Sequence, residues 1–215
     1  MHHEPNPIRV FEHAIAEHLA IIQSITAQEP LLQHIATEMA HAVLAGKKVL
    51  WCGNGGSAAD SQHLAAELMG RFRRERRGLP SVALTTDSSV LTAIANDYGY
   101  DRVFARQVES LCNSGDVVVG ISTSGNSRNV CAALETAKSL GAFTVALTGE
   151  SGGDLASIAD VTLRIPSSDT ARVQEGHILC GHMLCDWIEI AACAQDPGCR
   201  EESHAAAPVP AAAGS

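Results

Sequence analysis

Residues 49–64 read VLWCGNGGSAADSQHL, and this stretch predicts both the fold class and the position of a binding site. It joins a short apolar run to a glycine-rich turn and then to a helical pattern, with Ser57 as the expected N-cap. Glycines let backbone N–H groups approach a ligand, and the N-terminus of a helix favours negative charge. The junction therefore resembles a cradle for an anion, although a tight strand-to-helix turn would use the same residues.

The same order of strand and helix recurs through the rest of the chain. Apolar runs rich in β-branched residues, each leading into a helix, are typical of a parallel sheet covered on both faces. We therefore expect an α/β fold whose five-stranded parallel sheet is doubly wound in the flavodoxin-like manner. The predicted strands are 48–53, 81–85, 116–122, 143–149 and 160–166, and the predicted helices lie near 58–70, 88–111, 127–140, 151–159 and 170–193.

Two flanking segments differ from this α/β pattern. In the first segment, residues 1–45, helical periodicity runs from residue 4 to residue 45 in two pieces, divided near TAQEP (26–30), and Gly46 supplies a C-cap signal. We expect two N-terminal helices that pack on an α/β domain of residues 46–194 and take part in oligomerisation. Residues 195–215 are rich in Pro, Ala and Gly without periodicity, which predicts a disordered tail.

Composition limits the classes of partner. The formal charge is −9 and 46% of the residues are hydrophobic, which predicts a globular protein without a broad basic surface for nucleic acid or an anionic membrane. We find no run of about 18 apolar residues for a membrane span and no secretory signal in MHHEPNPIRVFEH, so a cytoplasmic location is expected. The arginine-rich RFRRERR (71–77) is short, and a solvated surface is favoured over a nucleic-acid patch.

The number and spacing of the cysteines argue against a fold that is held together by disulfides or by zinc. The chain has seven cysteines, an odd number without a CxxC pair or regular spacing. Neither a zinc ribbon nor a disulfide framework is indicated. Reduced, buried thiols are expected at positions 52, 112, 131, 180, 185, 193 and 199.

A second strand-to-helix junction repeats the chemistry of the first. In VVVGISTSGNSRNV (117–130), four hydroxyl residues, Ser122, Thr123, Ser124 and Ser127, lie between a strand and a helix start. One N-cap needs a single hydroxyl, and the others can donate to phosphate oxygens without any lysine. Two such turns at the carboxyl ends of neighbouring strands predict a phosphate or phosphosugar site, with a merely polar turn as the alternative.

Polar residues on two predicted helices suggest further chemistry. His63 and Glu67 are spaced i, i+4 after Asp60, which suits a shared metal but is equally common on a solvated helix face. In ARVQEGHILCGHMLCDW (171–187), a glutamine, a glutamate and two histidines interrupt an apolar pattern. Burying such groups without partners costs roughly 1–3 kcal/mol, so each faces solvent, satisfies another group or serves a site.

Five motifs in order over roughly residues 5–193 resemble the phosphoheptose isomerases, which are sugar-isomerase (SIS) domain proteins. The motifs are CGNGGSAADSQHLAAEL, LTAIANDYGYD, GISTSGNS, LTGESGGDLASIAD and QEGHILCGH. The resemblance implies conversion of D-sedoheptulose 7-phosphate to D-glycero-D-manno-heptose 7-phosphate, the first step toward the activated heptoses of lipopolysaccharide core or other surface glycans. It also implies a cytoplasmic homotetramer with active sites between subunits and one Zn²⁺ per subunit.

The resemblance assigns roles to individual positions. Glu67 would be the catalytic base and His182 the catalytic acid of an enediol mechanism, and His63, Glu67, Gln174 and His182 would be the metal ligands. Glu67 and His182 would each be both ligand and proton carrier, and a carboxylate held by zinc is a poorer base. Either the metal is structural, or one role yields to the other during turnover. Glu175 and His177 match no family role and are expected on the helix surface or in a satisfied contact. The substrate contacts would be Asn54, Gly55, Gly56, Ser57, Glu67, Asn96, Asp97, Ser122, Thr123, Ser124, Ser127 and Gln174, although Asn96 and Asp97 by themselves read first as a turn or helix end.

Helix geometry adds a constraint to this ligand set. Gln174 and His182 are eight residues apart, a rise of about 12 Å along one helix, whereas two ligands of one zinc lie about 3–4 Å apart. We therefore expect the two side chains at one metal to come from different subunits.

Other activities on the same domain compete with this interpretation. SIS-domain adaptors that bind the replication initiator DnaA are similar in sequence, but that relative departs from the isomerase pattern at the catalytic helix positions, where this chain has Glu67 and His182. A different phosphosugar isomerase or an amino-sugar lyase is a further alternative.

Overall fold

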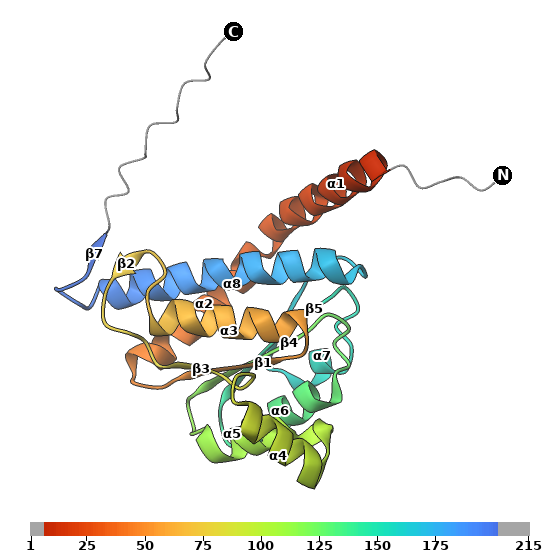
Figure 1. Ribbon diagram of the computed structural model, residues 1–215. Helices are drawn as coiled ribbons and strands as arrows, with labels where there is room; N and C mark the ends of the chain where they lie inside the picture. The colour runs from red at the N-terminus through yellow and green to blue at the C-terminus, as the bar shows by residue number, and fades with distance from the viewer. Residues whose placement is uncertain (1–6, 202–215) are drawn as a thin grey trace.

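Five parallel strands form the centre of the protein, which the computed structural model describes from residue 7 to residue 201 (Figure 1). Their spatial order is β3-β1-β4-β5-β6, which is the flavodoxin-like order with its switch point between β1 and β4. The expected five-stranded, doubly wound sheet is confirmed. The strand bounds are β1 (Val49–Gly53), β3 (Ser81–Ala83), β4 (Val117–Ser122), β5 (Phe143–Thr148) and β6 (Val161–Arg164).

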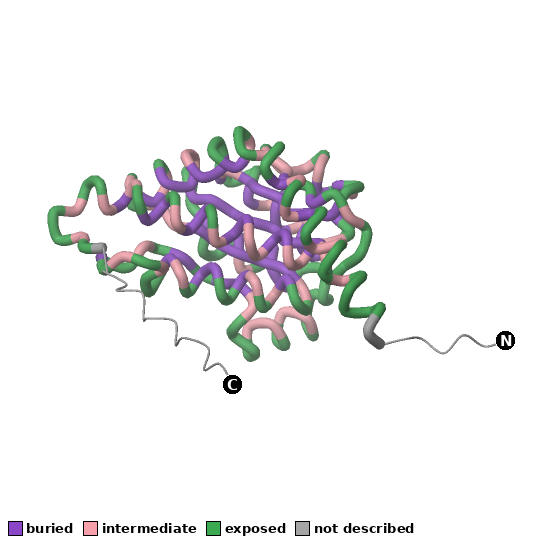
Figure 2. The backbone as a smooth tube through the Cα atoms, turned by 90° about the horizontal axis from the view of Figure 1, so that it is seen from above, coloured by how far each residue is buried: buried purple, intermediate pink, exposed green. Residues whose placement is uncertain are grey.

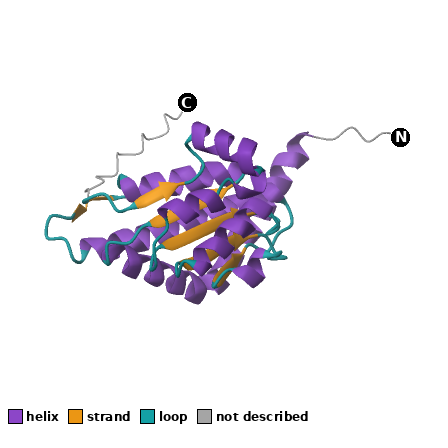
Figure 3. Ribbon diagram, turned by 90° about the horizontal axis from the view of Figure 1, so that it is seen from below, coloured by secondary structure: helices purple, strands orange, loops and turns teal. Residues whose placement is uncertain are grey.

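Helices cover both faces of this sheet (Figure 3). Alternate strand residues point to opposite faces, so Trp51 and Val119 join the core under α2, α3 and α8, while Leu50 and Val118 join the core under α5, α6 and α7. Figure 2 shows the buried strands between these layers. The helices are α1 (Pro7–Ile25), α2 (Glu29–Leu44), α3 (Gly56–Met69), α4 (Ser88–Tyr98), α5 (Ala105–Leu111), α6 (Arg128–Ser139), α7 (Leu155–Ile158) and α8 (Thr170–Cys193), with 3-10 turns η1 (Thr26–Gln28) and η2 (Tyr100–Arg102).

Two helix boundaries differ from expectation. The single helix predicted near 88–111 is divided, because Gly99 with φ of +86° ends α4 and the chain continues through η2 into α5. The prediction of Ser57 as an N-cap is wrong, since α3 begins at Gly56 and Gly55 occupies the cap position. Ser57 is instead buried in the first turn, where its backbone N–H donates to the Asn54 carbonyl.

The start of the expected tail is structured. Arg200–Glu201 forms a short strand, β7, that pairs antiparallel with β2 (Arg74–Glu75). The prediction of reduced thiols is wrong for Cys193 and Cys199, which form a disulfide, because the intervening AQDPG turn brings their Cα atoms to 5.2 Å. The other five cysteines are free thiols. Residues 202–215 of the expected tail lie outside the described residues.

The first helix extends from the body of the molecule (Figure 1). His18 of α1 contacts Glu175 of α8 at 2.8 Å, and Glu175 also pairs with Arg172. Along α1, however, Phe11, Ile15 and other apolar side chains remain exposed. Among residues 7–201, no helix combines the length and apolar character needed to cross a membrane.

Candidate active site

The turns after β1 and β4 meet the first turns of α8 around a hollow of about 290 Å³. This hollow lies at the switch point of the sheet, where doubly wound folds bind their ligands. Nine of the residues expected to contact substrate line it, together with Ile121 and Thr170, which were not expected. The nine are Asn54, Gly55, Gly56, Ser57, Ser122, Thr123, Ser124, Ser127 and Gln174.

Two glycines give the first turn its shape. Gly55 has a backbone φ of +57°, a conformation that residues other than glycine rarely adopt. Gly56 lies so close to α8 that a Cβ atom there would overlap the Gln174 amide. The GNGG sequence therefore lets α3 start at the pocket and lets Gln174 reach it from another helix.

The second turn supplies hydroxyl groups. Ser127 is the N-cap residue of α6 but makes no capping hydrogen bond, and its Oγ lies 2.9 Å from Ser122 Oγ. The Ser124 hydroxyl accepts from the backbone N–H of Asn126 at 3.1 Å. None of the described lining residues is lysine or arginine. The N-termini of α3 and α6 and the hydroxyls are thus the groups that can bind a phosphate.

His63, Glu67 and His182 form a second cluster, between α3 and α8. Their ligand-type atoms all lie within 4.8 Å of one another. His63 Nε2 is 2.9 Å from His182 Nε2 and 3.2 Å from Glu67 Oε1. Two imidazoles and a carboxylate that converge in this way match the donor types and spacing of a zinc site.

Burial and the neighbouring His63 lower the pKa of His182. Its imidazole is therefore neutral near pH 7, which is the form that binds a metal. A neutral imidazole can also donate its ring N–H to a developing enediolate oxygen.

The arginine-rich segment has a structural role that its sequence did not predict. The fully buried Glu189 of α8 accepts the backbone N–H groups of residues 72–74 at 2.8–2.9 Å and pairs with the buried Arg76 at 3.0 Å. This anchor places Phe72 on His182, with ring centroids 5.4 Å apart. The prediction of a solvated surface for residues 71–77 is therefore wrong for Arg76, which is buried.

Asn96 and Asp97 are not brought to the pocket. They lie exposed at the end of α4, where the Asn96 amide donates to the Asp97 carboxylate at 2.8 Å. The same segment reaches the pocket through Tyr100, whose hydroxyl donates to Asn54 Oδ1 at 3.2 Å. Tyr100 was missed because a tyrosine in NDYGYD carries no local signal for this contact.

Gln174 and His182 contact α3 at different positions along its length. Gln174 lies against Gly56 in the pocket, whereas His182 lies against His63. This separation agrees with the distance expected from the rise of the helix. That a partner subunit supplies the Gln174 ligand stays a prediction.

Two further polar side chains in this region have shifted pKa values, the buried His177 and the half-buried Asp60. His177, expected on the surface or in a satisfied contact, is 0% exposed; its Nε2 lies 3.0 Å from the Thr148 carbonyl, and its Nδ1 has no partner among residues 7–201. Burial lowers the pKa of His177 to about 4. Burial also raises the pKa of Asp60 to about 6, with His63 opposing the shift.

Comparison with known proteins points to one group of enzymes. The SIS domain family matches residues 12–149. The phosphoheptose isomerase of Geotalea daltonii is 54% identical over 176 residues, which are 81% of this chain and 92% of that protein. That of Aquifex aeolicus is 51% identical over 185 residues, which are 86% of this chain and 95% of that protein.

Solved structures agree with these sequence relatives. Phosphoheptose isomerase GmhA from Neisseria gonorrhoeae is similar with a TM-score of 0.79 at 46% identity, covering 85% of this chain and 97% of that chain. A phosphoheptose isomerase from Francisella tularensis has a TM-score of 0.83 at 37% identity, covering 86% of this chain and 100% of that chain.

Proposed function

Because the chain belongs to the SIS domain family and is similar to phosphoheptose isomerases over most of its length, we propose that it converts D-sedoheptulose 7-phosphate to D-glycero-D-manno-heptose 7-phosphate. The product would supply heptose for lipopolysaccharide core or another surface glycan. The observation that carries the proposal is that one chain has both a hydroxyl pocket without lysine, at the turns after β1 and β4, and a His-Glu-His cluster between α3 and α8. The pocket suits the phosphate, and the cluster suits proton transfer at the carbonyl end.

Glu67 and His182 divide the proton transfers of an enediol mechanism. Glu67 removes a proton from C1 of the ketose and, after exchange with solvent, delivers a proton to C2. His182 gives a proton to the C2 oxygen and takes one from the C1 hydroxyl. The hydroxyls of Ser122 and Ser127 and the helix N-termini hold the phosphate, so the reacting carbons are positioned before the proton moves.

We propose Zn²⁺ as the ion that His63, Glu67 and His182 hold. When bound, it would polarise the carbonyl oxygen and stabilise negative charge there. His63, Glu67 and His182 would supply three of the four ligands that zinc usually takes in proteins. Gln174 of a partner subunit is the proposed further ligand.

This ligand set implies a particular assembly. Gln174 lies in the phosphate pocket of its own chain, so the partner's Gln174 would bring the partner's pocket beside this chain's cluster. Each active site would then combine the cluster of one chain with the pocket of another. We propose a homotetramer built in this way.

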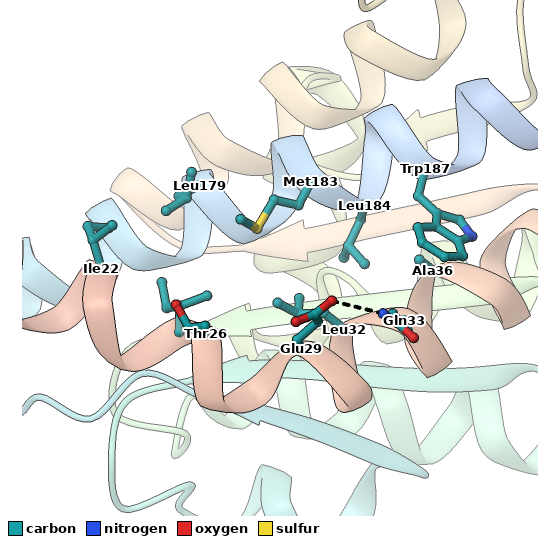
Figure 4. A pocket seen from close by; sticks show the side chains of 11 residues that line it. Ile22, Thr26, Glu29, Leu32, Gln33, Ala36, Leu179, Met183, Leu184 and Trp187 are labelled. Atoms are coloured by element: carbon teal, nitrogen blue, oxygen red, sulfur yellow. Dashed lines mark hydrogen bonds between the residues drawn. The ribbon is translucent and has the colours of Figure 1, made fainter.

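Exposed apolar surface supports such an assembly. A groove of about 400 Å³ runs between α8 and the α1–α2 region (Figure 4). Met183 and Trp187 line it, and these side chains are 47% and 42% exposed. Contiguous apolar surface of this kind marks a protein interface.

The adaptor alternative is not favoured by the comparisons. The relatives that match most of this chain are named phosphoheptose isomerases, and Glu67 and His182 converge in the structure. Binding of DnaA would not require that convergence.

An assay of two cluster variants tests the proposed activity. Purified protein supplied with Zn²⁺ should form heptose 7-phosphate from sedoheptulose 7-phosphate, and Glu67→Gln and His182→Ala should each lose about 100-fold or more in kcat. The exposed Glu135→Gln and His41→Ala variants serve as matched controls and should retain the parent rate. Near-parent turnover by either cluster variant would show that the acid and base assignment is wrong.

A further inference from the structure

Asn54 is the pocket residue whose side chain is most completely held by other side chains. Its Nδ2 donates to Asn129 Oδ1 at 2.9 Å, and its Oδ1 accepts from Asn129 Nδ2 at 2.8 Å. Oδ1 also accepts the Tyr100 hydroxyl at 3.2 Å. Three side chains from the β1–α3 turn, α6 and η2 therefore form one hydrogen-bonded group.

Counting donors and acceptors shows what remains for a ligand. A carboxamide has two N–H donors and an oxygen with two acceptor positions. Asn129 and Tyr100 occupy both acceptor positions of Asn54, and Asn129 accepts one of its N–H groups. Among residues 7–201, no protein acceptor takes the second N–H. The Asn54 side chain can therefore hydrogen-bond to a ligand in the pocket only by donating its second N–H.

The two supporting residues differ in burial. Asn129 is 3% exposed on the first turn of α6, so its amide is fixed by packing. Tyr100 is 58% exposed and begins η2, just after α4. The buried amide sets the plane of Asn54, and the tyrosine completes the group from the side of the α4–η2 segment.

We propose that Asn129 and Tyr100 are positioning residues of the isomerase, which act by holding the Asn54 carboxamide with one N–H free for an oxygen atom of the heptose phosphate. The inference rests on the proposed function, because it takes the pocket to be the sugar-phosphate site. A fixed donor loses no side-chain freedom when the ligand binds, and preorganisation of this kind raises affinity. Loss of either support should therefore weaken ligand binding more than it slows proton transfer at the cluster.

Calorimetric binding of heptitol 7-phosphate, the reduced substrate that has no carbonyl to isomerise, tests the proposal without turnover. We expect Asn129→Ala to raise Kd about tenfold and Tyr100→Phe about threefold, in line with the loss of one or two hydrogen bonds. In steady-state assays, KM should rise by similar factors while kcat changes less than about twofold. Tyr98→Phe is the matched control, since Tyr98 is 59% exposed and contacts Arg106 through its ring, which phenylalanine keeps.

A double-mutant cycle separates positioning from a general structural role. In an Asn54→Ala background, Asn129→Ala and Tyr100→Phe should add less than about twofold to Kd, because the group they position is gone. Full additivity, or an unchanged Kd in both single variants, would overturn the proposal. If Asn129→Ala does not fold, the exposed Tyr100→Phe still decides the outcome. Failure of the parent chain to bind heptitol 7-phosphate would instead overturn the proposed function, and this inference with it.

Discussion

His177 is a buried imidazole that the mechanism does not use. It contacts the Thr148 carbonyl at the end of β5, and its other ring nitrogen has no partner among residues 7–201. Because burial lowers its pKa to about 4 from an ordinary value of 6.5, the folded state resists protonation that the unfolded state accepts. The stabilisation from a neutral His177 is complete above about pH 6.5 and is lost as the pH falls toward about 4.

Replacement by glutamine should remove this pH dependence. His177→Gln keeps a side-chain N–H for the Thr148 carbonyl but cannot titrate. Between about pH 7 and pH 4.5, the unfolding free energy of the parent should fall by about 2 kcal/mol more than that of the variant. Urea denaturation at several pH values measures the difference. Because the pKa of Asp60 is raised, its protonation stabilises the folded protein as the pH falls over the same range. This contribution is the same in the parent and the variant, so it cancels from the comparison. Parallel pH profiles would contradict the buried neutral histidine.

Local sequence predicted some site residues and not others. The hydroxyls of residues 122–127 and the glycines after β1 form patterns whose chemistry is complete within one turn, so they were found. Phe72 contacts His182, and Asn129 contacts Asn54, across long stretches of chain. Such contacts depend on tertiary packing, and nothing in the neighbouring residues indicates them.

Among the elements, α8 was predicted with its observed bounds, because a helical apolar pattern runs through residues 170–193. The structure adds its N-cap, Asp169, whose side chain accepts from the backbone N–H groups of Ala171 and Arg172. β2 and β7 were not predicted, since each is only two residues long and their pairing depends on a distant partner. The segment between α3 and β3 is held instead by Glu189, which satisfies three backbone N–H groups and pairs with Arg76.

Removal of the Glu189 charge should destabilise the protein strongly. Glu189→Gln leaves Arg76 buried without its counter-ion, a loss of about 3–5 kcal/mol in unfolding free energy. Asp186→Asn is the matched control on the same helix, because Asp186 makes partly exposed ion pairs with Arg73 and Arg74 whose loss costs about 1 kcal/mol or less. Chemical denaturation of the two variants compares these costs. Equal destabilisation would show that Glu189 is not the anchor.

The whole assembly determines whether the cluster and the pocket act together. One chain holds Gln174 in its own phosphate pocket, against Gly56, and His182 in its own cluster, against His63. The sequence predicted this separation from helix rise alone. It suggested the N-terminal helices as an oligomerisation surface but did not indicate the groove along α8, because exposed apolar residues such as Met183 are recognised only on the folded surface.

Mixed assemblies should recover activity from two inactive chains. Glu67→Gln damages the cluster and Gln174→Ala damages the pocket, so each homomer should be nearly inactive. If sites form between chains, random co-assembly leaves about one quarter of the sites with both halves intact. The fraction of intact sites is measured as the isomerase activity that returns after an equal mixture of the two variants is dissociated and reassembled. When both chains also carry Met183→Lys in the α8 groove, the mixture should not recover activity. Leu140→Lys, at the exposed C-cap of α6, should leave the recovery unchanged. Absence of recovery in assembled oligomers would contradict sites shared between subunits.

Isomerisation of a ketoheptose phosphate by proton transfer through an enediol is the reaction proposed for this chain. NMR of the zinc-supplied protein with sedoheptulose 7-phosphate in D₂O tests it directly. We expect D-glycero-D-manno-heptose 7-phosphate with solvent deuterium at C2, because a carboxylate base exchanges its proton with solvent during turnover. Absence of the heptose phosphate, or a product formed without any deuterium at C2, would contradict this mechanism.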